Sequence, residues 1–519
     1  MFSMFSSIVT GSVSGLKSHL IHVEVDSSPG LPCFQMVGYL GSEVKEARER
    51  VKVALKNSGF TLPAKCINVN LSPASIRKSG TSYDLPIAVG LLVSLGEISP
   101  FRLDDTLLIG ELGLDGEIRR VRGILPITRH ACSAGIKRII LPLSNVNEGA
   151  LVPDINVIGV SSLKEVCDYL TCPEEEADSL IAPAPHPDIN DRVISELSSS
   201  GDFADVHGQT SVKRAAMVAA GGFHHMLMIG PPGSGKTMIA KRIPSILPPL
   251  TPEEALEVTS IYSVSGMLNE EHPLITTRPY ISPHHTITGH ALAGGGMFPR
   301  PGAISLAHRG VLFLDEMTEF RRDTLDIMRQ PLEDKKVHIV RNTGAYTYPA
   351  DFMLIAACNP CPCGYYPDRN KCSCTDVQVR RYISSISGPL LDRIDICCDV
   401  EPVNLCKPGE RSTGISSSDM RKKIALARER QSERFKGKSI RFNSEMSGRD
   451  IEEYCELAPK EQLTMQSACE SLGLSARSYH RILKVSRTIA DLEDSDVITE
   501  EHLSEALFYR TSGLRYWGR

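Results

Sequence analysis

The eight residues Gly230-Pro231-Pro232-Gly233-Ser234-Gly235-Lys236-Thr237 decide the fold of this 519-residue chain. An apolar run, Met226–Ile229, precedes them and a helix-forming run follows from Met238, so the order is strand, glycine-rich turn and helix. Glycines let backbone N–H groups approach phosphates, and the start of a helix favours negative charge. The stretch therefore predicts a phosphate-binding loop. In such a loop Lys236 reaches the β- and γ-phosphates and the Thr237 hydroxyl ligates Mg²⁺.

A second motif, further along the chain, supplies the carboxylates that such a loop requires. The apolar run Val311–Leu314 is typical of a buried strand and ends at Asp315 and Glu316. Asp315 suits the Mg²⁺ shell, and Glu316 is placed to polarise an attacking water. A buried strand that ends in a helix cap is the alternative, but the pairing of the two motifs favours an ATPase that uses ATP and Mg²⁺.

The composition is that of an ordinary globular protein, with 41% hydrophobic and 23% charged residues, and the length suffices for three domains. A net charge of −5 argues against general coating of nucleic acid but leaves a local basic channel open. The apolar stretch 85–95 is too short to span a bilayer, and no basic region precedes the apolar N-terminal residues. We expect a cytoplasmic protein with no membrane partner, whose fifteen cysteines are reduced unless they bind metal.

Hydrophobic periodicity predicts several domains of the α/β class. Near the N-terminus Ser42 is predicted to cap a helix, and Ile67, Val69 and Leu71 alternate with polar neighbours as in a strand. Proline- and glutamate-rich sequence then indicates a linker. The predicted parts are an α/β domain at 1–170, a linker at 171–200, an α/β nucleotide domain at 201–400 and a mostly helical remainder at 401–519.

Further motifs carry a family resemblance. The apolar strand 352–357 leads to Asn359, and Gly388-Pro-Leu-Leu-Asp-Arg393 presents an arginine in a loop. The chain resembles the AAA+ ATPases, and more narrowly the magnesium-chelatase-like branch that includes the ComM/YifB proteins. The resemblance covers nearly the whole chain and implies a P-loop core with a helical C-terminal lid. Its other marks are Gly208-Gln209, Ser282-Pro-His-His-Thr286, Ala293-Gly-Gly-Gly296, Pro299-Arg-Pro-Gly302, Ile304-Ser-Leu-Ala-His308 and Asn359-Pro-Cys-Pro-Cys-Gly364.

The resemblance implies roles for four polar residues. Asn359 would be sensor 1, Arg477 would be sensor 2, and Gln209 would lie in the ATP site. Arg393 would be an arginine finger that enters the ATP site of a neighbouring subunit, where such a residue raises the rate by ~10³–10⁵-fold. A finger supplied by a neighbour implies a ring, and the family implies a homo-hexamer.

The arginines have alternative interpretations. Arg393 would instead be structural if it formed an ion pair with Asp392 or Asp395, and Arg380 and Arg381 are rival candidates for the finger. Other cations share a helical face with Arg477 and are predicted to be mostly solvated: Arg481, Lys484 and Arg487.

Residues 107–142 resemble the proteolytic domain of Lon proteases, which has the fold of ribosomal S5 domain 2. Lon uses a serine–lysine dyad, in which a desolvated lysine activates the serine. Gly80-Thr81-Ser82 puts a serine at the nucleophile position, but Leu125 stands where the lysine is expected, and Lys137 lies beyond that site. The resemblance implies a Lon-protease-like domain that lacks the catalytic lysine and serves as a platform for assembly or for positioning DNA.

Four cysteines in one loop form a candidate metal site: Cys361, Cys363, Cys372 and Cys374. Four thiolates can make a closed tetrahedral Zn²⁺ site, which would be structural because no open ligand position is suggested. Cys358 complicates the choice of ligands, and a set of reduced loop thiols is the alternative.

A β-hairpin is predicted just before the Asn359 strand, with the turn Asn342-Thr343-Gly344. The resemblance implies that it is the pre-sensor 1 hairpin, which ring helicases point into the central channel. The insertion 294–301, which contains Arg300, is a second candidate for a moving pore loop. Solvated surface charge is the alternative for each basic residue. Three cations of the hairpin are predicted to contact DNA phosphates: Lys335, Lys336 and Arg341.

Three functions stay open from the sequence. The favoured one is a DNA helicase that drives branch migration when incoming DNA is recombined during natural transformation, with single-stranded or branched DNA and recombination proteins as partners. The second is a chelatase subunit that inserts Mg²⁺ into a porphyrin. The third is an ATP-dependent remodeller or protease of proteins, against which the absent lysine and the lack of a clear aromatic pore loop count.

Overall fold

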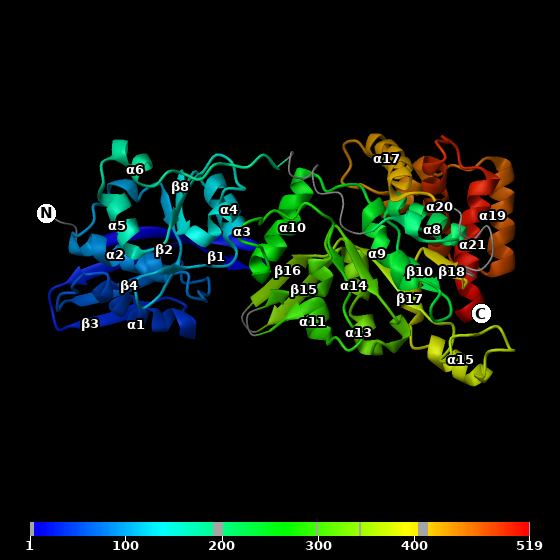
Figure 1. Ribbon diagram of the computed structural model, residues 1–519, viewed down its shortest axis with the longest axis horizontal. Coiled ribbons are helices and arrows are strands. Elements are labelled where there is room, and N and C mark those ends of the chain that lie inside the picture. The colour runs from blue at the N-terminus through cyan, green and yellow to red at the C-terminus, as the bar shows by residue number, and fades with distance from the viewer. Residues whose placement is uncertain (1–4, 190–200, 297–298, 342–343, 403–413, 518–519) are drawn as a thin grey trace.

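The computed structural model describes residues 5–189, 201–296, 299–341, 344–402 and 414–517. It shows an elongated molecule (Figure 1). An α/β domain in blue and cyan occupies one end, a second α/β module in green and yellow lies in the middle, and orange and red helices cover the other end. The mixed α/β class and the helical C-terminal region agree with the prediction.

The N-terminal domain is built on a seven-stranded sheet of order β3-β4-β2-β1-β5-β8-β9. Its longest strands, β1 (Phe5–Ser14) and β2 (Lys17–Ser28), form an antiparallel hairpin that turns at Gly15. Alternate residues of β4 are buried, as expected for a strand with one face in a core. The other strands are β3 (Cys33–Val37), β4 (Cys66–Ser72), β5 (Thr106–Leu108), β8 (Arg138–Pro142) and β9 (Asn156–Val160), with a separate pair β6 (Glu111–Leu112) and β7 (Ile118–Arg119).

Helices of the described residues that cover this sheet are α1 (Ser42–Asn57), α2 (Asp84–Leu95), α3 (Ile124–Ser133), α4 (Val146–Gly149) and α5 (Leu163–Thr171). The apolar run 85–95 becomes α2, which is buried along almost its whole length and forms the centre of the domain core. Ser42 is the first residue of α1 rather than its cap. Gly41 occupies the cap position because its N–H is held by the carbonyl of Lys78 at 2.8 Å.

One further expectation for this part is wrong. Cys33 and Cys66 are paired in register on neighbouring parallel strands and form a disulfide, so these two thiols are not reduced. The predicted linker begins with a helix, α6 (Glu174–Leu180), whose Ala177 is buried in the domain core. Residues 190–200 of the predicted linker lie outside the described part of the chain.

The nucleotide module contains a five-stranded parallel sheet of order β11-β14-β17-β10-β18. Four of its strands are fully or almost fully buried, which explains why they read as continuous apolar runs rather than as alternating ones. The strands are β10 (Met226–Ile229), β11 (Tyr280–Ile281), β14 (Val311–Leu314), β17 (Met353–Cys358) and β18 (Ile396–Asp399). Because β17 lies between β10 and β14, the ends of these three strands meet at one edge.

Helices and short insertions surround this sheet. They are α8 (Thr210–Gly222), α9 (Lys236–Ile246), α10 (Pro252–Ser265), α11 (Gly289–Ala293), α12 (Ala303–Leu306), α13 (Arg322–Asp326), α14 (Arg329–Asp334), α15 (Asp376–Ile383) and α16 (Gly388–Leu391). Two antiparallel pairs complete the module: β12 (Gly294–Gly295) with β13 (Arg300–Pro301), and β15 (Lys336–Arg341) with β16 (Gly344–Pro349). The second pair is the predicted hairpin, although Asn342 and Thr343 of its turn lie outside the described residues.

Helix α10 joins the module to the N-terminal domain (Figure 1). It packs against α3, and its buried Ala255 and Val258 share one apolar cluster with Leu125 and Ile127 of that helix. The carboxylate of Glu148 accepts hydrogen bonds from the Leu125 N–H and the Ser263 hydroxyl, which ties the two parts together by a buried polar contact.

The C-terminal helices are α17 (Ser417–Arg434), α18 (Gly448–Tyr454), α19 (Pro459–Leu472), α20 (Ala476–Leu492) and α21 (Glu500–Trp517). Helix α20 packs against α8, and α21 packs against β18. The helical region therefore shares its core with the nucleotide module instead of forming a separate one. Among the described helices, none is long and apolar enough to cross a membrane.

Candidate functional site

The phosphate-binding loop connects β10 to α9. A Cβ at Gly230 would lie 2.2 Å from the carbonyl oxygen of Val400, so only glycine fits there. Gly233 and Gly235 have φ of +75° and +92°, and a Cβ on either would meet open space. Their constraint is thus conformational, because the left-handed backbone turns the loop N–H groups towards one point. The loop then enters α9 at Lys236, which places a helix N-terminus at the same point.

Lys236 and Asn359 lie side by side within this loop. The Lys236 ammonium donates to the carbonyls of Gly230 at 2.7 Å and Pro231 at 2.9 Å, and to Oδ1 of Asn359 at 3.1 Å. Burial lowers the pKa of Lys236. The Ser234 hydroxyl is buried and has no hydrogen-bond partner among the described residues. A buried hydroxyl and a movable ammonium inside a ring of N–H groups fit a polyphosphate.

The metal-binding and water-activating groups come from the end of β14. The Thr237 hydroxyl donates to a carboxylate oxygen of Asp315 at 2.7 Å, so the two oxygen ligands proposed for Mg²⁺ already lie together. Glu316 is exposed and has a left-handed φ of 50°. Nδ1 of His285 lies 3.9 Å from its carboxylate. The sequence pattern around His285 pointed to the family but indicated no role for that residue.

Gln209 lies on the other side of the loop. Its amide donates to the carbonyl of Ser234 at 3.3 Å and to that of Glu401, and its φ of 56° makes it the left-handed cap of α8. The side chain therefore fastens the phosphate-binding loop to the segment after β18. Its assignment to the ATP site stays a prediction.

Arg393 lies at the other end of the parallel strands, on the side of the sheet where they begin. It closely precedes β18, and the neighbouring Asp395 N–H donates to the carbonyl of His225, the residue before β10. A four-residue strand is roughly 13 Å long, which exceeds the reach of an arginine side chain. Arg393 therefore cannot reach the loop of its own chain. It forms an ion pair with Glu333 at 2.6 Å, whereas the alternative partners Asp392 and Asp395 are not used.

The helical face of Arg477 lies at this same edge. Arg477 is exposed, while Arg481, one turn later, lies 3.6 Å from Asp395. Arg510 of α21 donates to Asp392 and to the Ser478 hydroxyl. Among the described residues, three guanidinium N–H groups of this cluster are buried without a hydrogen-bond acceptor, one each on Arg393, Arg481 and Arg510.

The prediction that the rest of this face is solvated is wrong. Arg487 is 3% exposed and paired with Asp491, and the Lys484 ammonium donates to the carbonyl of Ser444 at 3.0 Å. The helical spacing was correctly identified, but it does not distinguish a solvated face from one that packs against a second layer of ion pairs. Arg510 was missed because its position in a later helix carries no local signal.

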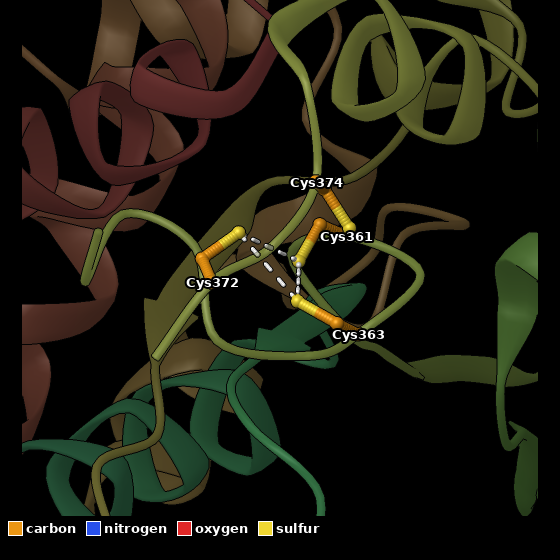
Figure 2. A group of neighbouring side chains, drawn as sticks. All are labelled: Cys361, Cys363, Cys372 and Cys374. Atoms are coloured by element: carbon orange, nitrogen blue, oxygen red, sulfur yellow. Dashed lines mark hydrogen bonds between the residues drawn. The ribbon is translucent and has the colours of Figure 1, made fainter. Parts of the chain in front are cut away.

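The four cysteines of the loop after Asn359 come together (Figure 2). All four sulfur atoms lie within 4.8 Å of one another, and the Sγ–Sγ distances are 3.3 Å for Cys361–Cys363, 3.5 Å for Cys363–Cys372 and 3.8 Å for Cys361–Cys372. Four sulfurs at the Zn–S bond length are about 3.8 Å apart in a tetrahedron, whereas disulfide sulfurs are about 2.05 Å apart. The donor set therefore fits Zn²⁺. Cys358 is buried at the end of β17 and is not one of the four.

This loop, which we call the cysteine loop (361–374), contacts the phosphate-binding loop directly. A Cβ at Gly364 would lie 2.3 Å from the ring of Pro232. Cysteines of the loop also share an apolar cluster with Tyr516 and Trp517 at the end of α21. The indole N–H of Trp517 donates to the carbonyl of Ile383 at 3.2 Å.

The hairpin cations are not equivalent. Lys335 is paired with Asp351 at 3.1 Å and with Glu445, so it holds the base of the hairpin against the C-terminal region. Lys336 is exposed at the start of β15. Arg341, at the far end of β15, is exposed and lies 3.5 Å from Nδ1 of His290. Of the three, Lys336 and Arg341 are presented to solvent. The rival finger candidates Arg380 and Arg381 are both exposed on α15.

In the segment that resembles Lon, the structure has Leu125 at the position where the resemblance predicts the lysine. Leu125 is completely buried in the first turn of α3, and its backbone N–H is bonded to Glu148. Ser82 lines a cavity together with arginine side chains. The structure therefore shows no lysine in the place of the Lon base, and a serine without that base is a weak nucleophile.

Comparison with known proteins agrees with this geometry. Residues 202–407 match the family model described as magnesium chelatase, subunit ChlI, residues 23–145 match that of subunit ChlI of Mg-chelatase, and residues 414–510 match that of the ChlI C-terminal part. The chain is 41% identical over 509 residues to YifB of Escherichia coli (strain K12), which covers 97% of both chains. It is 40% identical over 501 residues to the competence protein ComM of Haemophilus influenzae, which covers 96% of this chain and 95% of that one. A shorter match, 30% identical over 151 residues and 28% of this chain, is to an archaeal Lon protease of Pyrococcus abyssi.

Proposed function

This chain belongs to the ComM/YifB family of magnesium-chelatase-like AAA+ ATPases, and from that premise we propose that it is an ATP-hydrolysing ring motor that translocates on DNA. The motor would promote branch migration when incoming DNA is recombined. The competence name of the Haemophilus influenzae relative supports this role. The observation that carries the motor is that Arg393 lies where β18 begins, whereas Lys236 and Asp315 lie where β10 and β14 end, beyond its reach.

Within one subunit, Lys236 would exchange its bonds to the loop carbonyls for the phosphates of ATP. Thr237 and Asp315 would hold Mg²⁺, which supplies positive charge to the phosphate oxygens as the bond breaks. Glu316 would orient the attacking water, and Asn359 would respond to the γ-phosphate because its amide already contacts the Lys236 ammonium.

A second subunit completes the site in this proposal. Arg393 cannot reach the ATP of its own chain, and its cluster holds buried N–H donors without acceptors among the described residues. When this edge faces the phosphate-binding loop of a neighbour, Arg393 and Arg477 would supply charge to the transferred phosphoryl group. Head-to-tail repetition of that contact closes into a ring, which we propose to be a hexamer.

We further propose that the cysteine loop holds a structural Zn²⁺ through Cys361, Cys363, Cys372 and Cys374. The sulfur distances support this. The contact of Gly364 with Pro232 would let the metal site stabilise the phosphate-binding loop. A closed site would keep the phosphate-binding loop and Asn359 in a fixed relation, because both adjoin the same rigid loop.

The test is ATP-dependent dissociation of a fluorescent four-way DNA junction by the purified protein, beside Lys236→Ala and Glu316→Gln. The proposal expects that only the intact protein resolves the junction and that DNA stimulates its ATPase. A protein that hydrolyses ATP, leaves junctions intact and ignores DNA would refute the DNA role.

A chelatase subunit is the second candidate, because all three matching family models carry that description. The nearly full-length similarity to the competence protein ComM favours the DNA motor instead. Measuring Mg²⁺ insertion into protoporphyrin with chelatase partner subunits separates the two.

A further inference from the structure

A cavity of about 770 Å³ lies where the N-terminal domain meets the nucleotide module. One wall comes from the β1–β2 turn, from residues 75–82 and from residues 120–123 of the N-terminal domain. The opposite wall consists of Val264, Pro299, Arg300 and Tyr346 of the nucleotide module. We call this cavity the seam cleft.

The seam cleft is lined by more cations than anions. Four arginines face it, against the carboxylates of Glu43 and Glu111, and Glu111 is already bonded to the Thr81 hydroxyl. His19 also lines it, but burial lowers the pKa of this imidazole. The four arginines are Arg77, Arg120, Arg122 and Arg300. Arg120 is paired with Glu270 at 3.1 Å. In the part of the chain that the structure describes, neither Arg122 nor Arg300 is paired with a carboxylate.

The Arg122 side chain packs against the backbone of Gly266 at the end of α10. Gly266 ends α10 in a left-handed conformation, and a Cβ there would lie 2.6 Å from Nε of Arg122. Glycine thus leaves room for the guanidinium beside the C-terminal end of α10. Burial and the nearby charges of Arg300 and Arg120 lower the pKa of Arg122. Converging guanidinium groups repel each other, and a bound polyanion relieves that repulsion.

The cleft is also attached to the predicted pore hairpin. Tyr346 of β16 lines the cleft and packs partly against the apolar core of the nucleotide module. Two residues later, the Tyr348 hydroxyl donates to the carbonyl of Pro299 at 2.6 Å. The hairpin and Arg300 are therefore linked, whereas Arg120 and Arg122 belong to the N-terminal domain. A movement of the hairpin would change the distance between the two groups of arginines.

We propose that the seam cleft binds the phosphodiester backbone of single-stranded DNA through Arg120, Arg122 and Arg300, with a base stacked on Tyr346. This inference rests on the proposed function, because it names where the DNA would be held. An aromatic ring beside guanidinium groups favours a nucleic acid over an acidic protein segment, which would use the charges but not the stacking surface. The N-terminal domain would then provide a second DNA-binding surface, which would hold the strand while the hairpin releases it.

The test measures binding of a fluorescent mixed-sequence oligonucleotide to the full-length protein as a function of salt. Replacing Arg122 and Arg300 together by glutamate should weaken binding about tenfold or more, and the slope of log affinity against log salt should fall by about 0.7 for each phosphate that is no longer neutralised. Arg122→Lys, which keeps the positive charge, should retain most of the wild-type affinity. Lys164→Glu, an exposed cation of the same domain outside the cleft, is the matched control and should bind like the wild type.

Photocrosslinking of wild-type protein to bromodeoxyuridine-containing single strands adds a measurement that needs no substitution. The crosslinked peptide should contain Tyr346. Crosslinks that map only outside the cleft, or a double variant with unchanged affinity and salt slope, would overturn the seam cleft and leave the motor intact. Binding of polyglutamate that competes equally with DNA would assign the cleft to an acidic protein. If the wild type binds no DNA at all, the proposed function fails together with the cleft.

Discussion

The two ends of the parallel strands of the nucleotide module differ in how their polar groups are paired within one chain. We call the side where the strands end the carboxyl edge and the side where they begin the amino edge. At the carboxyl edge Lys236 contacts Asn359, and Thr237 contacts Asp315. At the amino edge Arg393 is joined by residues of α20 and α21, and buried guanidinium N–H groups lack acceptors within the described residues. At the first edge the groups proposed for catalysis contact one another, while the second holds donors that find no acceptor. In our interpretation Arg393 and the exposed Arg477 are the half of the site that serves another subunit.

The largest expected effect comes from breaking the amino edge. Arg393→Ala should lower the ATPase rate by ~10³–10⁵-fold, because an arginine finger stabilises charge that develops only during phosphoryl transfer. Steady-state ATP hydrolysis checks this, with Arg380→Ala and Arg381→Ala as controls on the rival positions.

Mixing variants shows whether the site is divided between chains. Lys236→Ala and Arg393→Ala should each be inactive alone, but a mixture forms some interfaces that combine an intact loop with an intact arginine. Recovered activity in the mixture supports a divided site. If the mixture stays as inactive as its components, Arg393 acts within its own chain. The proposal that the site is divided between two subunits is then wrong.

At the carboxyl edge, Glu316→Gln should lower hydrolysis by ~10²–10⁴-fold while ATP still binds, because the amide cannot polarise the attacking water. Single-turnover hydrolysis and nucleotide binding measured on the same sample separate the two effects. Glu319→Gln changes an exposed carboxylate three residues later and should behave like the wild type. Loss of ATP binding in Glu316→Gln would instead give Glu316 a structural role.

Removal of the metal should disorder the cysteine loop, which packs against the phosphate-binding loop at the carboxyl edge. We expect one Zn²⁺ per chain and expect a strong chelator to change the fluorescence of Trp517, because this residue, the single tryptophan of the chain, packs on the cysteine loop. Elemental analysis and emission spectra provide the measurements. Cys363→Ser should lose the metal, whereas Cys132→Ser, in α3, should keep it. A metal content that is the same in both variants would remove the zinc proposal.

The contrast between the edges also explains what the sequence could predict. The carboxyl edge uses contiguous motifs, each ending a buried strand, so 230–237 and 311–316 revealed most of it. The amino edge is assembled from separate helices, and Arg510 becomes a neighbour of Asp392 only through the fold. The solvation of Arg481 and Arg487 was predicted wrongly because spacing specifies a helix face but not what covers it. The disulfide had no sequence signal, since it depends on the register of two strands.

The smallest expected effect concerns acid stability of the amino edge. Glu257 of α10 contacts His308 and, at 3.0 Å, Arg309 just before β14, and these contacts lower the pKa of Glu257 to about 2, led by the hydrogen bond from His308. The unfolded carboxyl has a pKa of about 4.3, so the stabilisation is present above that pH and is lost as pH falls towards 2. Because the side chain is 40% exposed, screening limits the contribution to about 1 kcal/mol.

Glu257→Gln should therefore flatten the fall of the thermal midpoint between about pH 5 and 2, which differential scanning calorimetry measures. Glu253→Gln, on the solvent side of the same helix, should leave the curve unchanged. If both variants follow the wild-type curve, the ion pairs of α10 contribute nothing measurable at this edge. The rigidity of the amino edge would then have to come from the buried Arg309–Asp351 pair at 2.6 Å, which joins the starts of β14 and β17 without help from α10.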